Sequence, residues 1–138
     1  MKWNMQTPKK GDIIRVAIGD IYHYGIYVSD DEVIQFGMPP RNIKMMTATD
    51  VVVLTTNIDV FLGGGFLEVG SMSFTEKLKA KKSDAIVDYA RSRIGTGGYN
   101  ILYNNCEHFV NECVFGVKKC DQVEDVRAKV LKDLKGKV

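Results

Sequence analysis

The sequence predicts an α+β fold in which a small antiparallel sheet packs against helices. The first half of the 138-residue chain contains short runs of alternating apolar and polar residues separated by turn signals, which is typical of strands. The second half changes to the three-to-four-residue apolar spacing of amphipathic helices. A chain of this length has room for one substantial core, so we expect residues 1–138 to form a single domain.

Strands are expected in the first half of the chain. Four runs are rich in β-branched and aromatic residues and are bounded by turn residues: 12–18, 21–28, 32–36 and 50–57. The prolines in 37–42 cannot take part in a central ladder, and 61–66 contains three consecutive glycines. Both of these segments are therefore expected to be loops.

Helices are expected in the second half. Ser83 is a suitable N-cap for a helix over 84–94, and Gly95 fits the position just past its end. Residues 118–138 place valines and a leucine on one face and charges on the rest, which predicts an amphipathic C-terminal helix. A further helix is expected to begin near Cys106.

Cys106 stands at the start of this helix. Asn104 is expected to cap it, with Glu107 three residues later in the manner of a capping box, and Gly116 is expected to end it. Cys106 is then at about the second helical position, where the backbone N–H groups and the helix dipole lower a thiol pKa and can hold an oxyanion. These features make Cys106 a candidate nucleophile, and a small core residue at a helix start is the alternative.

A nucleophilic cysteine needs a base, and the chain contains two histidines. His108 is two positions after Cys106 in the helix, so it is expected to point away from the sulfur and to have a surface or helix-packing role. His23, in the second expected strand, is therefore the candidate base. A histidine in a strand is more often a packed residue, but this chain offers no other candidate.

Gln35 is the candidate for the group that orients His23. A three-residue loop after Val28 pairs that residue with Glu32 and sets Gln35 on the same face as His23, beside a glycine that leaves room for both. A plain two-residue loop turns Gln35 to the other face. The hypothesis therefore requires an odd-length loop or a bulge in this hairpin.

The other cysteines are not expected to take part in chemistry. Cys113 lies two turns after Cys106 and lacks the helix-start environment, so Cys113 and Cys120 are interpreted as structural or incidental. Cys106, Cys113 and His23 are zinc-ligand types, but no CxxC or HxxxH pair accompanies them. We expect no metal and no other cofactor.

The charge and the chain ends exclude further classes of protein. The formal net charge is +2 and no basic cluster is interleaved with aromatic residues, so nucleic acid is not an expected partner. A mild attraction to anionic membranes is compatible with peripheral membrane contact. The N-terminal residues lack the apolar core of a signal peptide, and no apolar run approaches ~18 residues. We expect a soluble, cytoplasmic protein with reduced thiols and no transmembrane anchor.

Two pairs of motifs resemble a known family. "GDIIRV" and "HYGIYV", followed by "NCEHFVNE" and "GVKKCDQVEDV", resemble the lecithin:retinol acyltransferase family, and most closely its small H-Ras-like-suppressor phospholipase A/acyltransferases. The resemblance covers about 9–126 and implies a circularly permuted papain-like (NlpC-type) catalytic domain. It implies Cys106 as nucleophile and His23 as base, with Gln35 where many relatives have a second histidine. The charged segment 118–138 differs from the apolar anchor with which several relatives end.

The resemblance also implies the reaction. A glycerophospholipid ester would acylate Cys106 as a thioester, and water or an amine would then release the acyl group, as in a phospholipase A1/A2 or an N-acyltransferase. The Cys106 N–H, with Tyr22 or Tyr24, would stabilise the oxyanion. Three residues are expected to border the substrate: Tyr99, Asn104 and Asn105. Two alternatives stay open, namely an NlpC-type cysteine amidase or peptidase and an interaction module whose activity the glutamine has weakened.

Overall fold

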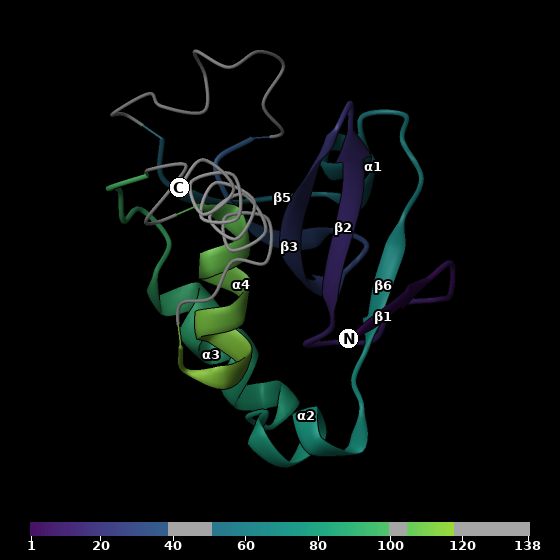
Figure 1. Ribbon diagram of the computed structural model, residues 1–138. Helices are drawn as coiled ribbons and strands as arrows, with labels where there is room; N and C mark the ends of the chain where they lie inside the picture. Colours follow the sequence, from purple (N-terminus) through teal and green to yellow (C-terminus); the bar gives the residue numbers. More distant parts are fainter. Residues whose placement is uncertain (39–50, 100–104, 118–138) are drawn as a thin grey trace, which may run out of the picture.

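The computed structural model describes residues 1–38, 51–99 and 105–117 of the chain. Within these ranges the chain forms an antiparallel sheet of six strands, in the order β1-β6-β2-β3-β4-β5, and four helices (Figure 1). The strands are β1 Lys2–Asn4, β2 Ile13–Ile18, β3 Ile21–Ser29, β4 Glu32–Phe36, β5 Val53–Thr56 and β6 Glu68–Ser71. The helices are α1 Ile58–Leu62, α2 Phe74–Lys79, α3 Ser83–Ser92 and α4 Cys106–Phe115. The expected α+β class is therefore confirmed.

The sheet separates two apolar clusters. Helices α3 and α4 lie side by side and pack against β3, whereas α1 contacts β4 (Figure 1). The α4-side cluster contains Ile13, Tyr24, Ile26, Ile34, Phe36, Val53, Ile86, Ala90, Cys106, Phe109, Val110, Cys113 and Val114. The α1-side cluster contains Ile14, Val16, Tyr27, Val33, Phe61 and Val69. Alternate residues of β2, β3 and β4 enter different clusters, because side chains alternate across a pleated sheet.

The expected strands match the structure except at 50–57, where β5 covers only Val53–Thr56. The sequence did not indicate β1, β6, α1 or α2, which are three to six residues long. The expected loop at 61–66 is partly wrong, because Phe61 and Leu62 complete α1. Asn57 caps that helix by accepting the Val60 N–H at 2.8 Å.

The expected start of α3 is wrong by one residue. Ser83 is the first helical residue, and Lys82 takes the N-cap position without a side-chain hydrogen bond. The helix ends at Ser92, and Gly95 lies beyond it with a φ of 89°. An N-cap hydroxyl is therefore not what sets the start of this helix.

The hairpin between β3 and β4 decides where Gln35 points. Gly25 pairs with Gln35 as expected, but Ser29, and not Val28, pairs with Glu32. The turn thus has two residues, and the register shifts between Tyr27 and Ser29, which is a β-bulge. The expected three-residue loop is wrong. The bulge nevertheless sets Gln35 on the same face of the sheet as His23, because it adds one residue to β3.

No helix within the described ranges is long and apolar enough to cross a membrane. The amphipathic helix expected over 118–138 lies outside the described residues, as do Asn104, Cys120 and most of the expected loop at 37–42.

Candidate active site

Cys106 is the first residue of α4 and is buried, with 6% of its surface exposed. Asn105, and not Asn104, is the N-cap: its Oδ1 accepts the N–H groups of Glu107 and His108, each at 3.0 Å. The cap fixes the first turn and therefore the position from which Cys106 projects. A thiol in this first turn lies at the positive end of the helix dipole.

His108 closes the cap from the other side. Its Nδ1 accepts the Asn105 N–H at 3.1 Å, so that His108 takes the capping-box role expected of Glu107. The ring is buried, with 7% exposed, which contradicts a surface role. His108 therefore stabilises the first turn of α4, in which Cys106 lies. This role was not expected from the sequence, because Glu and Gln are the usual residues at this position of a capping box.

His23 and Gln35 form a buried pair at the centre of the sheet. His23 Nε2 and Gln35 Oε1 are 2.6 Å apart, and the two side chains are 1% and 0% exposed. An amide oxygen only accepts hydrogen bonds, so His23 Nε2 carries the proton in the neutral ring and Nδ1 is the basic nitrogen. Gln35 Nε2 in turn donates to Met38 Sδ at 3.7 Å. The expected orienting contact is present.

Gly25 makes room for this pair. It faces Gln35 across the ladder, and a Cβ at this position would lie 2.9 Å from both Phe61 Cε2 and Val33 Cγ1. The absence of a side chain lets the Phe61 ring approach His23, with ring centroids 5.3 Å apart. Phe61 is thus a neighbour of the candidate base that the sequence did not indicate, because it lies in a helix too short to show a period.

Burial controls the charge of His23. Desolvation lowers the pKa of His23 to about 4, and the hydrogen bond that His23 donates to Gln35 acts in the opposite direction. The ring is therefore neutral near pH 7 and can accept a proton at Nδ1. Burial also disfavours the charged form of Cys113, and it raises the pKa of that thiol to about 12. This agrees with the inert role expected of Cys113.

The two tyrosines differ in their surroundings. Tyr24 is buried in the α4-side cluster with Cys106, and burial and then the Glu107 charge raise its pKa well above the usual range. Tyr22 is partly buried, and its ring lies 3.8 Å from the Arg15 guanidinium carbon. Tyr24 thus stays a protonated donor near the candidate nucleophile, whereas Tyr22 is stacked on a cation.

The remaining candidates lie at the start of α4 or near β4. Tyr99 packs edge-on against Phe36, the residue after Gln35, with centroids 5.1 Å apart. The Asn105 side-chain oxygen is used by the helix cap. The proposed substrate contacts of Tyr99 and Asn105 stay predictions, and Asn104 lies outside the described residues.

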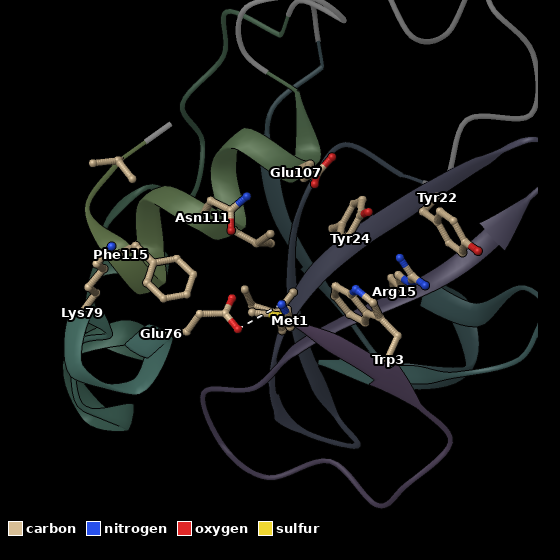
Figure 2. A pocket seen from close by; sticks show the side chains of 13 residues that line it. Met1, Trp3, Arg15, Tyr22, Tyr24, Glu76, Lys79, Glu107, Asn111 and Phe115 are labelled. Atoms are coloured by element: carbon tan, nitrogen blue, oxygen red, sulfur yellow. Dashed lines mark ion pairs between the residues drawn. The ribbon is translucent and has the colours of Figure 1, made fainter. Parts of the chain in front are cut away.

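A cavity of about 800 Å³ lies between α4 and the strands β1 to β3 (Figure 2). It runs from Glu76 and Lys79 of α2 at one end to Glu107, the residue after Cys106, at the other (Figure 2). Its walls are Met1, Trp3, Ile13, Arg15, Tyr22, Tyr24, Glu76, Lys79, Glu107, Val110, Asn111, Phe115 and Val117. The Arg15 guanidinium carbon lies 4.1 Å from the centroid of the Trp3 ring. Arg15 Nη2 forms an ion pair with Glu68 Oε2 at 3.4 Å.

The sequence did not predict this cavity. Its wall residues come mainly from β1, β2, β3, α2 and α4, which are far apart in the chain. Among these wall residues, only Tyr22 and Tyr24 had an expected role in the site, and that role came from the family resemblance. An isolated Arg15 in an apolar strand was the one available signal, since a charge in such a run needs a partner when it is buried.

Comparisons with known proteins give one family. The family model for lecithin retinol acyltransferase matches residues 6–119. Human phospholipase A and acyltransferase 4 is 27% identical over 133 residues, which cover 91% of this chain and 80% of the relative. Human phospholipase A and acyltransferase 2 is 30% identical over 125 residues, covering 84% and 76%. Mouse lecithin retinol acyltransferase is 26% identical over 134 residues, covering 83% of this chain and 58% of that protein.

Proposed function

The chain belongs to the lecithin retinol acyltransferase family, and from this premise we propose that it is a thiol-dependent acyltransferase and phospholipase A-type hydrolase of glycerophospholipid esters. The observation that carries the proposal is the 2.6 Å contact between His23 Nε2 and Gln35 Oε1. It leaves His23 Nδ1 as the basic nitrogen of a buried, neutral imidazole, which is what activation of a thiol requires. In this proposal the whole chain is one catalytic domain with a circularly permuted papain-like topology.

Proton transfer requires the Cys106 thiol and the His23 ring to lie close together. The His23 ring is on the α1 side of β3, beside Phe61, whereas Cys106 belongs to the α4-side cluster. The pairing of β3 with β4 ends at Gly25, so that, among the described residues, no β4 residue pairs with β3 at His23. We propose that Cys106 Sγ approaches His23 Nδ1 over this edge of β3, to within about 4 Å.

The reaction begins with proton transfer from Cys106 Sγ to His23 Nδ1. The thiolate attacks the ester carbonyl carbon, and the electron pair of the carbonyl moves onto its oxygen. The Cys106 N–H and the protonated Tyr24 hydroxyl are the proposed oxyanion donors. The tetrahedral intermediate then expels the lysophospholipid alkoxide, which takes the proton from His23, and leaves the acyl group on Cys106 as a thioester.

A second acceptor completes the cycle. Water gives a free fatty acid, and an amine gives an amide; in each case His23 Nδ1 takes the proton of the attacking group and returns it to the departing sulfur. The cavity beside Glu107 is the proposed site for part of the lipid, since aromatic and aliphatic side chains form much of its wall. Gln35 holds the ring through both halves of the cycle and exchanges no proton.

Intact-mass analysis tests the proposal. Incubation with a phosphatidylcholine of defined chains is expected to add one acyl mass, which peptide mapping assigns to Cys106. Cys106→Ala should abolish the adduct, His23→Ala should slow its formation by at least about a hundredfold, and Cys113→Ala should leave it in place. Iodoacetamide should label Cys106 much faster than Cys113, because burial raises the Cys113 pKa to about 12, whereas Cys106 lies in the first turn of α4 at the positive end of the helix dipole.

The same assay separates the alternatives. Cleavage of a peptide substrate without any acyl adduct from phospholipid would assign the chain to the NlpC-type amidases or peptidases. Absence of both reactions, with equal labelling of all cysteines, would favour an interaction module and contradict the proposed enzyme.

A further inference from the structure

Helix α2 exposes the apolar residues that a helix normally buries. Phe74 and Leu78 are 77% and 72% exposed, and no residue of this helix is buried. They are four positions apart, so they lie on the same helix face and form one outward-facing apolar ridge. An amphipathic helix in a globular protein turns such a ridge toward the core, and this one has no contact that covers it among the described residues.

Cations surround this ridge. Lys77 lies within the helix, and Lys82 follows it in the turn before α3; both side chains are exposed. No ion pair involves either lysine within the described part of the chain. The one carboxylate of the helix, Glu76, is occupied by the N-cap, where it accepts the Ser73 N–H at 3.0 Å. The face that carries the two apolar side chains is therefore positively charged.

We propose that α2 and the turn after it dock on an anionic lipid bilayer. In this arrangement Phe74 and Leu78 enter the headgroup region, while Lys77 and Lys82 pair with lipid phosphates and carboxylates. The α2 surface, defined as these four residues, combines the two signals of an interfacial helix, namely large apolar side chains and flanking lysines. Two isolated apolar side chains give too small a patch for a stable protein–protein interface, which buries about 800 Å² on each partner.

The α2 surface lies at one end of the cavity. Glu76 and Lys79 of the same helix line that cavity, and Glu107 marks its other end, next to Cys106 (Figure 2). Docking would therefore bring the α2 end of the cavity to the lipid, from which a substrate could enter toward Cys106. This last link rests on the proposed function, whereas the docking itself does not.

Vesicle co-sedimentation tests the docking without any turnover. The Cys106→Ala protein is mixed with vesicles of phosphatidylcholine alone or of phosphatidylcholine with phosphatidylserine. We expect binding to the mixed vesicles and weaker binding as salt is added. Phe74→Ser with Leu78→Ser should weaken this binding at least tenfold, because both side chains lose apolar burial. Lys77→Gln with Lys82→Gln should weaken it about twenty-five-fold, at about fivefold for each cation.

Phe66→Ser is the matched control, since Phe66 is 76% exposed but lies between α1 and β6, outside the α2 surface. It should bind vesicles like the parent protein, and circular dichroism should show all variants folded. Failure of the parent to bind mixed vesicles, or equal loss with Phe66→Ser, would overturn the proposal. A dimer that dissociates in Phe74→Ser with Leu78→Ser, seen by light scattering while vesicle binding is unchanged, would overturn it in favour of self-association.

The acylation assay keeps the two proposals apart. Vesicle binding by Cys106→Ala with no acyl adduct on the parent protein would contradict the enzyme and leave the docking surface standing. The converse result, acylation by a short-chain dispersed phospholipid without vesicle binding, would contradict the docking alone.

Discussion

The partner that orients the His23 ring is the neutral side chain of Gln35. A glutamine amide accepts one hydrogen bond and holds the ring, but it gives the imidazolium less stabilisation than a carboxylate does. Its place in the site depends on one extra residue in β3, since the bulge between Tyr27 and Ser29 keeps Gln35 on the face of His23. The orientation of the candidate base thus depends on a local backbone irregularity.

Gln35→Ala should lower turnover while Cys106 remains the acylated residue. The substitution leaves the buried His23 Nε2–H without its acceptor, which costs about 1–3 kcal/mol, and it releases the ring from its orientation. Gln35→His places a second imidazole there, and it should keep or raise the rate. Steady-state kinetics and mapping of the acyl adduct measure both effects. Unchanged turnover in Gln35→Ala would remove Gln35 from the site.

The buried imidazole of His23 should also make stability depend on pH. Its pKa is lowered from 6.5 to about 4 in the fold, so the neutral ring is favoured there. The unfolded chain therefore binds the proton first as pH falls, and the free energy of unfolding should decrease from about pH 6.5 down to about pH 4, by about 3 kcal/mol in total. Urea unfolding of the parent and of His23→Asn checks this. The variant should lose that part of the slope, and equal slopes would contradict the assignment.

The pairing of His23 with Gln35 could be predicted from the sequence because side chains alternate along strands with a period of two. The sequence indicated that either an odd-length loop or a bulge was needed to set this register. It could not show which of the two occurs, because a two-residue and a three-residue turn both fit the Ser29-Asp30-Asp31 segment. The approach of Cys106 to His23 stays a prediction. It depends on how a helix and a strand meet in space, which spacing along the chain does not determine.

Among the elements, α4 has the cap that most affects the proposed chemistry. Asn105 and His108 close a capping box directly around Cys106. The sequence offered two adjacent asparagines, either of which can cap a helix, so its prediction of the start was wrong by one residue. The short elements β1, α1, α2 and β6 could not be predicted, because each spans too few residues to show a period.

Removal of the α4 cap should lower the reactivity of Cys106 as well as the stability of the fold. Asn105→Ala should cost about 1–2 kcal/mol and should slow the reaction of Cys106 with iodoacetamide, because the first turn loses the side chain that holds it. Ser73→Ala is the matched control, since Ser73 and Glu76 form the capping box of α2, and this variant should leave Cys106 unaffected. Equal Cys106 reactivity in both variants would show that the cap does not act on the thiol.

At the scale of the whole molecule, one sheet carries apolar clusters on both faces, and each central strand contributes to both. Neither the strands of the first half nor the helices of the second can bury their apolar side chains alone. Trp3, the only tryptophan of the chain, reports on the outer strand β1, and Cys113 is a fully buried residue of α4. The two probes thus follow opposite parts of the molecule.

If the chain is one cooperative domain, both probes should change together. In a variant with Cys106→Ala and Cys120→Ala, the urea dependence of Trp3 fluorescence and of Cys113 alkylation should have the same midpoint. Coincidence is expected because β3 packs against α4 on one side and pairs with β2 on the other, so the helix layer cannot leave without exposing the sheet. Alkylation of Cys113 at a urea concentration where Trp3 fluorescence is still native would instead reveal two units. The candidate base on β3 and the candidate nucleophile on α4 would then belong to parts that unfold separately.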